Sequence, residues 1–136
     1  MAYEKPRPGL DDVSAPYWQA AQRHELVAQK CAQCANYLFP PTTVCEHCLS
    51  TDLIWTPLSG KGSVWSFIVM YQQYYPSFAD DIPYNIAVVR TQEGPKFLTN
   101  LVGIANDAIT VDMPVEVVFD DVDTDLTLPK WRPMVR

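Results

Sequence analysis

The sequence is short of charged residues, of dense basic stretches and of long apolar runs, and each shortage excludes a class of protein. Charged residues make up 19% of the 136 residues against 48% apolar residues, which excludes a disordered chain and a coiled coil. No apolar run approaches the ~20 residues that a membrane-spanning helix needs. Residues 1–10 lack the apolar core of a signal peptide, so we expect a cytoplasmic protein. The net charge of −6, with no basic stripe, argues against nucleic-acid binding.

What the sequence does have is a tight cluster of cysteines, arranged as two Cys-x-x-Cys pairs: Cys31 with Cys34, and Cys45 with Cys48. Two such turns brought together form a tetrahedral cage of sulfurs, which suits zinc. In a cytosolic chain this spacing indicates a metal site before disulfides, and iron in a rubredoxin-like cage is the alternative ion. Because four sulfurs leave no open position for water, we expect a structural zinc that stabilises a small ribbon.

Catalytic side chains are scarce. The chain has two histidines, His24 and His47, and neither has an obvious serine or aspartate partner in the sequence. A nucleophile needs an adjacent base and an orienting group, and every cysteine is expected to bind metal. We therefore predict that the chain is not an enzyme by itself and that both histidines lie on its surface. The acidic run at 120–125 lacks the glycine and glutamate of a calcium loop and is expected to be a solvated hairpin.

Turn and strand signals divide the chain into an N-terminal arm and helix (1–25), a zinc ribbon (26–57) and a β-domain (58–136). Ser14 is the expected N-cap of the helix, and Pro16 suits its first turn. Strands are expected at 26–30 and 53–57 in the ribbon, and at 64–69, 86–90, 96–102, 115–119 and 126–128 in the β-domain. The fold class is therefore mainly β, and a five-stranded OB-fold barrel is the natural candidate for the β-domain.

Apolar side chains on both faces of the segment 64–69 predict a strand buried on both sides. Two aromatic clusters lie outside the expected barrel core: Tyr17 and Trp18 on the helix, and Tyr74, Tyr75, Phe78 and Tyr84 in the long loop 71–84. Each cluster either packs on the chain's own core or docks on a partner. Large aromatic side chains are favoured anchors of protein interfaces, so we keep both clusters as candidate partner or ligand surfaces.

Several motifs together resemble a known family. They are Tyr17-Trp18-x-Ala20-Ala21, the two Cys-x-x-Cys pairs on either side of Phe39-Pro40-Pro41, Gly60-Lys61-Gly62-Ser63-Val64, Pro83-Tyr84, Glu93-Gly94-Pro95, Thr99-Asn100-Leu101-Val102-Gly103, Met113-Pro114-Val115-Glu116-Val117, and Leu126-Thr127-Leu128-Pro129 before Trp131-Arg132-Pro133. This set resembles the small acyl-CoA-associated OB-fold proteins that carry an N-terminal rubredoxin-like zinc ribbon. The resemblance covers residues 11–133.

The resemblance implies a non-catalytic helper subunit in a hetero-oligomer with a thiolase-fold enzyme. Enzymes of this kind make or break carbon–carbon bonds next to a CoA thioester, as thiolases, acetyltransferases and retro-aldolases do. It further implies that the partner supplies the catalytic residues, while the small subunit stabilises the complex and helps to form the acyl-CoA channel. The family's zinc ligands fall on Cys31, Cys34, Cys45 and Cys48.

Two alternatives remain beside this reading: a free-standing acyl-CoA or acyl-carrier binding module, and a single-stranded nucleic-acid binder, since zinc ribbons and OB-folds both occur there. CoA phosphates need cationic contacts. Among the basic residues of the β-domain, we take Lys61, Arg90, Lys96, Lys130 and Arg132 as the candidates for a phosphate contact. Their alternative role is that of scattered surface charges.

Overall fold

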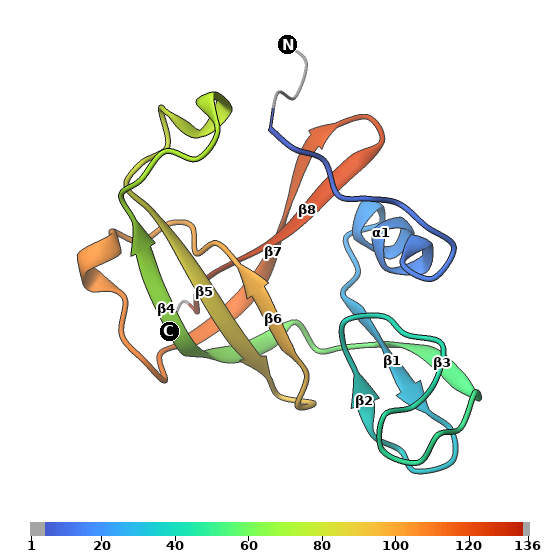
Figure 1. Cartoon of the computed structure of the whole chain (residues 1–136). Coiled ribbons are helices and arrows are strands. Elements are labelled where there is room, and N and C mark those ends of the chain that lie inside the picture. Colours follow the sequence, from blue (N-terminus) through green and yellow to red (C-terminus); the bar gives the residue numbers. More distant parts are fainter. Residues whose placement is uncertain (1–4, 135–136) are drawn as a thin grey trace.

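A computed structural model describes residues 5–134 and shows a small β-barrel with a zinc ribbon beside it (Figure 1). Residues 1–4 of the predicted arm and the last two residues of the predicted β-domain lie outside the described part. The barrel strands, as the structure has them, are β4 (Lys61–Met70), β5 (Tyr84–Thr91), β6 (Lys96–Thr99), β7 (Pro114–Asp123) and β8 (Leu126–Pro133). Short 3-10 turns, η1 (Pro76–Phe78) and η2 (Asn106–Ala108), lie in the connecting loops.

The five barrel strands form one antiparallel sheet in the order β6-β5-β4-β7-β8. A parallel bridge between Leu101 and Trp131 brings the end of β6 beside β8 and nearly closes the barrel. This order and closure confirm the predicted OB-fold. The strand expected at 96–102 ends at Thr99, whereas the one expected at 126–128 continues to Pro133.

The ribbon is a second sheet of three short antiparallel strands, ordered β2-β1-β3. Its strands are β1 (Val27–Cys31), β2 (Tyr37–Leu38) and β3 (Leu53–Pro57). Strand β3 leads into the barrel through Gly60, whose φ of 76° is a conformation that glycine adopts without a steric penalty.

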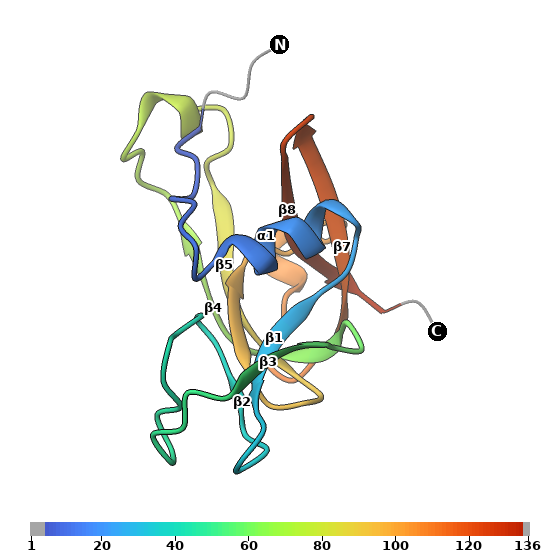
Figure 2. The same ribbon diagram turned by 90° about the vertical axis from the view of Figure 1, so that its right-hand side faces the viewer.

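The helix α1 (Ala15–Gln22) begins after Ser14 and carries Pro16 in its first turn, as predicted. Two perpendicular views place it between the ribbon and the β7–β8 hairpin (Figure 1 and Figure 2). No helix within residues 5–134 has the length and apolar character needed to cross a membrane.

Tyr17 of α1 is buried in a core that the helix, the ribbon and the barrel share. Its ring packs 5.2 Å from Phe39 of the ribbon, and Phe39 lies 4.2 Å from Phe97 of β6. Burial raises the pKa of the Tyr17 hydroxyl. Of the two roles left open for this side chain, the structure places it in the chain's own core. Trp18 is half-buried and packs edge-on against Tyr17.

The expected burial of strand 64–69 on both sides is wrong within this chain. A β-bulge shifts the pairing with β5 between Val64 and Ser66. Val64 and Phe67 face the core, whereas Trp65, Ser66 and Ile68 are not covered by the chain. The bulge breaks the simple alternation and turns Trp65 to the outside, because the extra residue of a bulge lies outside the regular pairing.

Replacing Tyr17 by alanine should lower the free energy of unfolding by about 3–5 kcal/mol, the usual effect of removing a large buried aromatic ring. The matched control is Tyr74→Ala, because Tyr74 is 64% exposed whereas Tyr17 is 8% exposed. The control should change stability by less than about 0.5 kcal/mol. Urea unfolding of the full zinc-loaded chain measures both. Equal stability of the two variants would contradict the shared core.

Candidate functional site

The four cysteines meet at the tip of the ribbon and form the one candidate metal site within residues 5–134. Their Sγ atoms all lie within 4.8 Å of one another. The pairs Cys31–Cys48 and Cys34–Cys45 are 3.5 and 3.6 Å apart, and none of the four forms a disulfide. Four sulfurs at about 2.3 Å from a zinc ion lie about 3.8 Å from one another, so the observed cage fits a tetrahedral ion.

The two cysteine turns have the same backbone geometry. In each, the residue after the second cysteine takes a left-handed conformation, with φ of 64° at Ala35 and 67° at Leu49. The N–H of that residue donates a 2.9 Å hydrogen bond to the carbonyl of the first cysteine of its pair. Residues other than glycine rarely adopt this backbone conformation. The surrounding structure therefore holds both turns in the same form, in which the two sulfurs of each turn point to the same side.

Hydrogen bonds prepare the sulfurs for a cation. The backbone N–H of Asn36 and its side-chain amide donate to Sγ of Cys34 and lower the pKa of that thiol to about 6. The N–H of His47 donates to Sγ of Cys45 at 3.4 Å. Metal binds the thiolate form, so the two donors of Asn36 favour the ligating state of Cys34. No motif in the sequence indicated the role of Asn36.

Both histidines lie outside the cage, on the surface, and neither forms a catalytic arrangement in the described part of the chain. Nε2 of His24 lies 3.0 Å from a carboxylate oxygen of Asp121, and the buried Thr127 hydroxyl donates to the same carboxylate. The carboxylate therefore lies between the hydroxyl and the imidazole. In a nucleophile–base pair the imidazole must take that middle position, so Thr127 is not activated.

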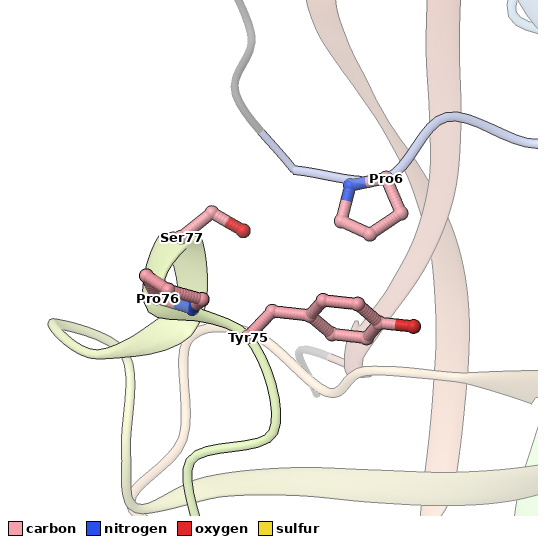
Figure 3. A pocket seen from close by; sticks show the side chains of 4 residues that line it. All are labelled: Pro6, Tyr75, Pro76 and Ser77. Atoms are coloured by element: carbon pink, nitrogen blue, oxygen red, sulfur yellow. The ribbon is translucent and has the colours of Figure 1, made fainter.

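The aromatic loop between β4 and β5 lies at one end of the barrel, beside the N-terminal arm. Tyr74 and Tyr75 are exposed, whereas Phe78 packs between Tyr75 and Tyr84 at 6.3 and 5.7 Å. Figure 3 shows the hollow where the arm meets this loop, with Pro6 facing the Tyr75 ring and the turn of η1. The loop thus divides into a part packed on the chain and an exposed part with three tyrosines, Tyr71, Tyr74 and Tyr75.

A larger hollow opens between this loop and the β7–β8 hairpin, the two connections that contribute to ligand binding in many OB-folds. Two lysines line it, and each is paired with a carboxylate that also lines it. Lys5 binds Asp81 at 2.7 Å and Lys130 binds Asp120 at 2.7 Å. The hollow therefore offers little net positive charge to a phosphate or to a nucleic-acid backbone.

The acidic run 120–125 forms the end of β7 and the hairpin to β8, and several partners contact it. Arg7 of the arm binds Asp123 at 2.6 Å and Asp125 at 2.9 Å. The hydrogen bond from Arg7 holds the pKa of Asp123 well below its usual range. The hairpin is thus held to the arm, a contact that the sequence did not predict because 116 residues separate Arg7 from Asp123.

The five basic residues considered for CoA phosphates do not form one cluster. Lys130 faces Asp120, and Arg132 lies 3.5 Å from Glu116. Lys61 is the register partner of Glu116 on the neighbouring strand. Arg90 and Lys96 are register partners of each other on β5 and β6. A phosphate-binding role of this set remains a prediction, and three of its members already have a carboxylate beside them.

One exposed surface was not predicted from the sequence: the outward face of β4, β5 and β6, which includes Trp65, Ile68 and Leu98. The signal for it was present in the strand 64–69, whose side chains are apolar on both faces. The pattern correctly indicated apolar character on both sides, but the second side is not covered by this chain.

The chain matches two adjacent family models. The rubredoxin-like zinc ribbon domain of ChsH2 matches residues 18–53, and the C-terminal OB-fold domain of ChsH2 matches residues 55–120. A DUF35 domain-containing scaffold protein of Methanothermobacter thermautotrophicus is 34% identical, over 74% of this chain and 76% of that protein. A probable enoyl-CoA hydratase alpha subunit of Thermomonospora curvata is 40% identical over 96% of this chain, which spans only 40% of that subunit.

Two solved structures are similar in fold. One is described as an Ltp2-ChsH2(DUF35) aldolase; its matched chain is 40% identical with a TM-score of 0.86, over 95% of this chain and 100% of that one. The other is a DUF35 protein of unknown function from Sulfolobus solfataricus, 14% identical with a TM-score of 0.62, over 90% of this chain and 86% of that one. At that identity, the second likeness concerns the fold alone.

Replacing Cys34 or Cys45 by serine should remove the metal and unfold the ribbon, because a structural zinc contributes folding free energy directly. We expect about one zinc per wild-type chain and less than about half an equivalent in each variant, with most of the variant protein insoluble. Elemental analysis of the purified chain measures the content. His47→Ala is the control and should keep a full equivalent. Soluble, folded wild-type chain without zinc would contradict the assignment.

Proposed function

The chain belongs to the DUF35 family, with the ChsH2 arrangement of a rubredoxin-like zinc ribbon followed by an OB-fold domain, and we propose that it is a non-catalytic accessory subunit of a thiolase-fold acyl-CoA enzyme. The enzyme forms or cleaves a carbon–carbon bond next to a CoA thioester, as a thiolase, an acetyltransferase or a retro-aldolase does. The small subunit stabilises the complex and helps to shape the acyl-CoA site.

The observation that carries the proposal is the match to the chain in the Ltp2-ChsH2(DUF35) aldolase. That chain is covered completely at 40% identity, so the similarity extends through the ribbon, the helix and the barrel. The scaffold proteins of the same family support a role in assembly over one in chemistry. The chain spans 40% of the hydratase alpha subunit, so the hydratase activity named for that whole subunit is not transferred.

The side chains of the described part support a non-catalytic role. The four cysteines are gathered in one cage. His24 is bound to a carboxylate, and His47 lies beside Glu46 on the surface of the second cysteine turn. No hydroxyl or thiol within residues 5–134 has an imidazole positioned to take its proton, which a covalent mechanism needs. The reacting groups therefore belong to the partner.

Zinc in this proposal is structural. The cage of Cys31, Cys34, Cys45 and Cys48 supplies all four ligands, and zinc bound there holds together two turns that lack an apolar core of their own. The small cluster around the cage consists of cysteines and two leucines, Leu38 and Leu53. With no position left for a substrate or a water, the ion stabilises the ribbon and takes no part in the reaction.

The CoA thioester is a ligand of the complex, and we propose that the partner makes most of its contacts. The hollow at the loop end of the barrel has its lysines paired, and Arg132 lies beside Glu116. This charge distribution weighs against the alternative of a free-standing acyl-CoA module, because such a module needs several uncompensated cations around the phosphates. It weighs equally against single-stranded nucleic acid.

Co-expression with a thiolase-fold protein from the same organism should yield a stable hetero-oligomer that acts on an acyl-CoA substrate. The small chain alone should show no turnover, because it lacks a nucleophile–base pair. Size-exclusion chromatography and an assay of acyl-CoA cleavage or condensation measure the two results. Turnover by the small chain alone, or two proteins that elute separately at micromolar concentration, would contradict the proposal.

A double variant, His24→Ala with His47→Ala, is the control for the non-catalytic role. It should bind the partner and leave the kcat of the complex within about twofold, since neither imidazole is placed for proton transfer. A loss of kcat of a hundredfold or more with the complex intact would assign chemistry to this chain.

A further inference from the structure

The outward face of the sheet formed by β4, β5 and β6 is apolar and not covered by the chain. Pairing aligns Ser66 of β4 with Val88 of β5, and Val88 with Leu98 of β6; Ile68 and Ile86 form the next row. Leu98 is 73% exposed, Ile68 53% and Trp65 45%. We call this surface the outer sheet face and define it by Trp65, Ile68, Val88, Leu98, Arg90 and Lys96.

The exposed apolar side chains of the chain concentrate here. Eleven large apolar side chains are exposed in the described part, and six of them lie on β4, on β6 or in the loop that follows β4: Trp65, Ile68, Tyr71, Tyr74, Tyr75 and Leu98. Single exposed apolar residues are common on proteins, whereas a contiguous group of this kind marks an interaction site. The loop with the exposed tyrosines follows directly on β4 in the chain.

The bulge in β4 adds an anchor to this face. Because of the bulge, Trp65 and Ser66 both lie on the outside of the sheet. In a regular strand, only one of two successive side chains points to a given face. Nζ of Lys96 lies 3.9 Å from the centre of the Trp65 ring, a cation–π contact that limits the motion of both side chains. A large aromatic ring held in one orientation is a typical centre of an interface.

The charges on this face are of one sign. The three strands contain no aspartate or glutamate, although the whole chain has 16 acidic residues and a net charge of −6. Arg90 and Lys96 are directly opposite each other across β5 and β6, an arrangement that is unfavourable for like charges. The nearest carboxylate in the sequence, Glu93, accepts hydrogen bonds from Ser59. A negative group from another molecule would relieve this repulsion.

We propose that the outer sheet face is the surface that binds the thiolase-fold partner, through an apolar patch on the partner with a carboxylate opposite Arg90 and Lys96. This inference rests on the proposed function, which supplies the partner. A second copy of this chain that used the same face fits less well. In such a symmetric dimer, Arg90 and Lys96 would meet the same two cations of the other copy and no carboxylate from its strands β4, β5 and β6.

The apolar part of the proposal is tested with two isoleucines of matched exposure. Ile68 on the outer sheet face is 53% exposed, and Ile54 on β3 of the ribbon is 54% exposed. Ile68→Asp and Leu98→Asp should each weaken binding to the co-expressed thiolase-fold protein at least about 30-fold, as expected for residues at the centre of an interface. Ile54→Asp should change the dissociation constant by less than threefold, and isothermal titration calorimetry measures all three.

The charged part is tested by charge reversal in the absence of CoA. Arg90→Glu with Lys96→Glu should weaken partner binding at least tenfold at low salt, and the loss should shrink as salt is added. The matched control is Lys61→Glu with Arg132→Glu, which changes the charge equally beside Glu116 on another part of the sheet. The control should leave the affinity within about threefold. A loss that appears only when CoA is present would show that the two cations bind its phosphates and would overturn the carboxylate contact.

The possible failures are distinguishable. If the wild-type chain does not bind the thiolase-fold protein, the proposed function fails and this surface fails with it. If the wild-type chain binds and Ile68→Asp binds equally well, while circular dichroism and zinc content show both folded, the outer sheet face is not the docking surface. A wild-type homodimer in sedimentation that Ile68→Asp dissociates, with no effect on the partner, would assign the face to a second copy.

Discussion

A single group of aromatic rings joins the three parts of this chain. Tyr17 comes from the helix, Phe39 from the loop between the two cysteine turns and Phe97 from the barrel, and the three rings lie within 6.4 Å of one another. The ribbon has a cage of sulfurs at its far end and almost no core of its own. Its orientation on the barrel therefore depends on this shared core, in which Phe39 packs against both of the other rings and Ala28, Tyr37 and Trp55 of the ribbon also take part.

Much of the architecture could be predicted because the responsible signals are local. Two Cys-x-x-Cys turns predict a sulfur cage wherever they occur, and turn residues separate the barrel strands. What the sequence could not provide is register. The bulge at Trp65 depends on how β4 pairs with β5, so the outward direction of Trp65 is set by another strand. Likewise, nothing in the sequence around Tyr17 distinguishes a residue of the core from an anchor of an interface.

The last strand, β8, continues through a proline. The sequence predicts a strand at 126–128, whereas β8 runs on to Pro133, with Pro129 paired to Phe119. Proline lacks an N–H, which matters only where the neighbouring strand needs that donor. On the far side, the Pro129 carbonyl accepts a hydrogen bond from the Thr99 hydroxyl, and β8 is joined to β6 mainly through the bridge at Leu101. A strand with such an irregular neighbour tolerates a missing donor.

The N-terminal arm borders the hollow between the aromatic loop and the β7–β8 hairpin. Its Lys5 is bound to the aromatic loop at Asp81, and its Arg7 is bound to the hairpin at Asp123 and Asp125. These are exposed ion pairs, so each contributes little to stability. Together these ion pairs neutralise the cations that a phosphate ligand would need at this end of the barrel. The surface that remains available for binding lies on the side of the barrel.

Charge is also distributed unevenly around the barrel. The hairpin between β7 and β8 carries four aspartates, at 120, 121, 123 and 125, and the cations that pair with them in the structure are Arg7 and Lys130. The strands β4, β5 and β6 carry cations and no carboxylate. Figure 1 places the hairpin and these three strands on different sides of the barrel. The aspartates of the hairpin repel an acidic partner, whereas Arg90 and Lys96 attract it. The electrostatic field of the chain therefore favours an approach toward the outer sheet face and its apolar rows.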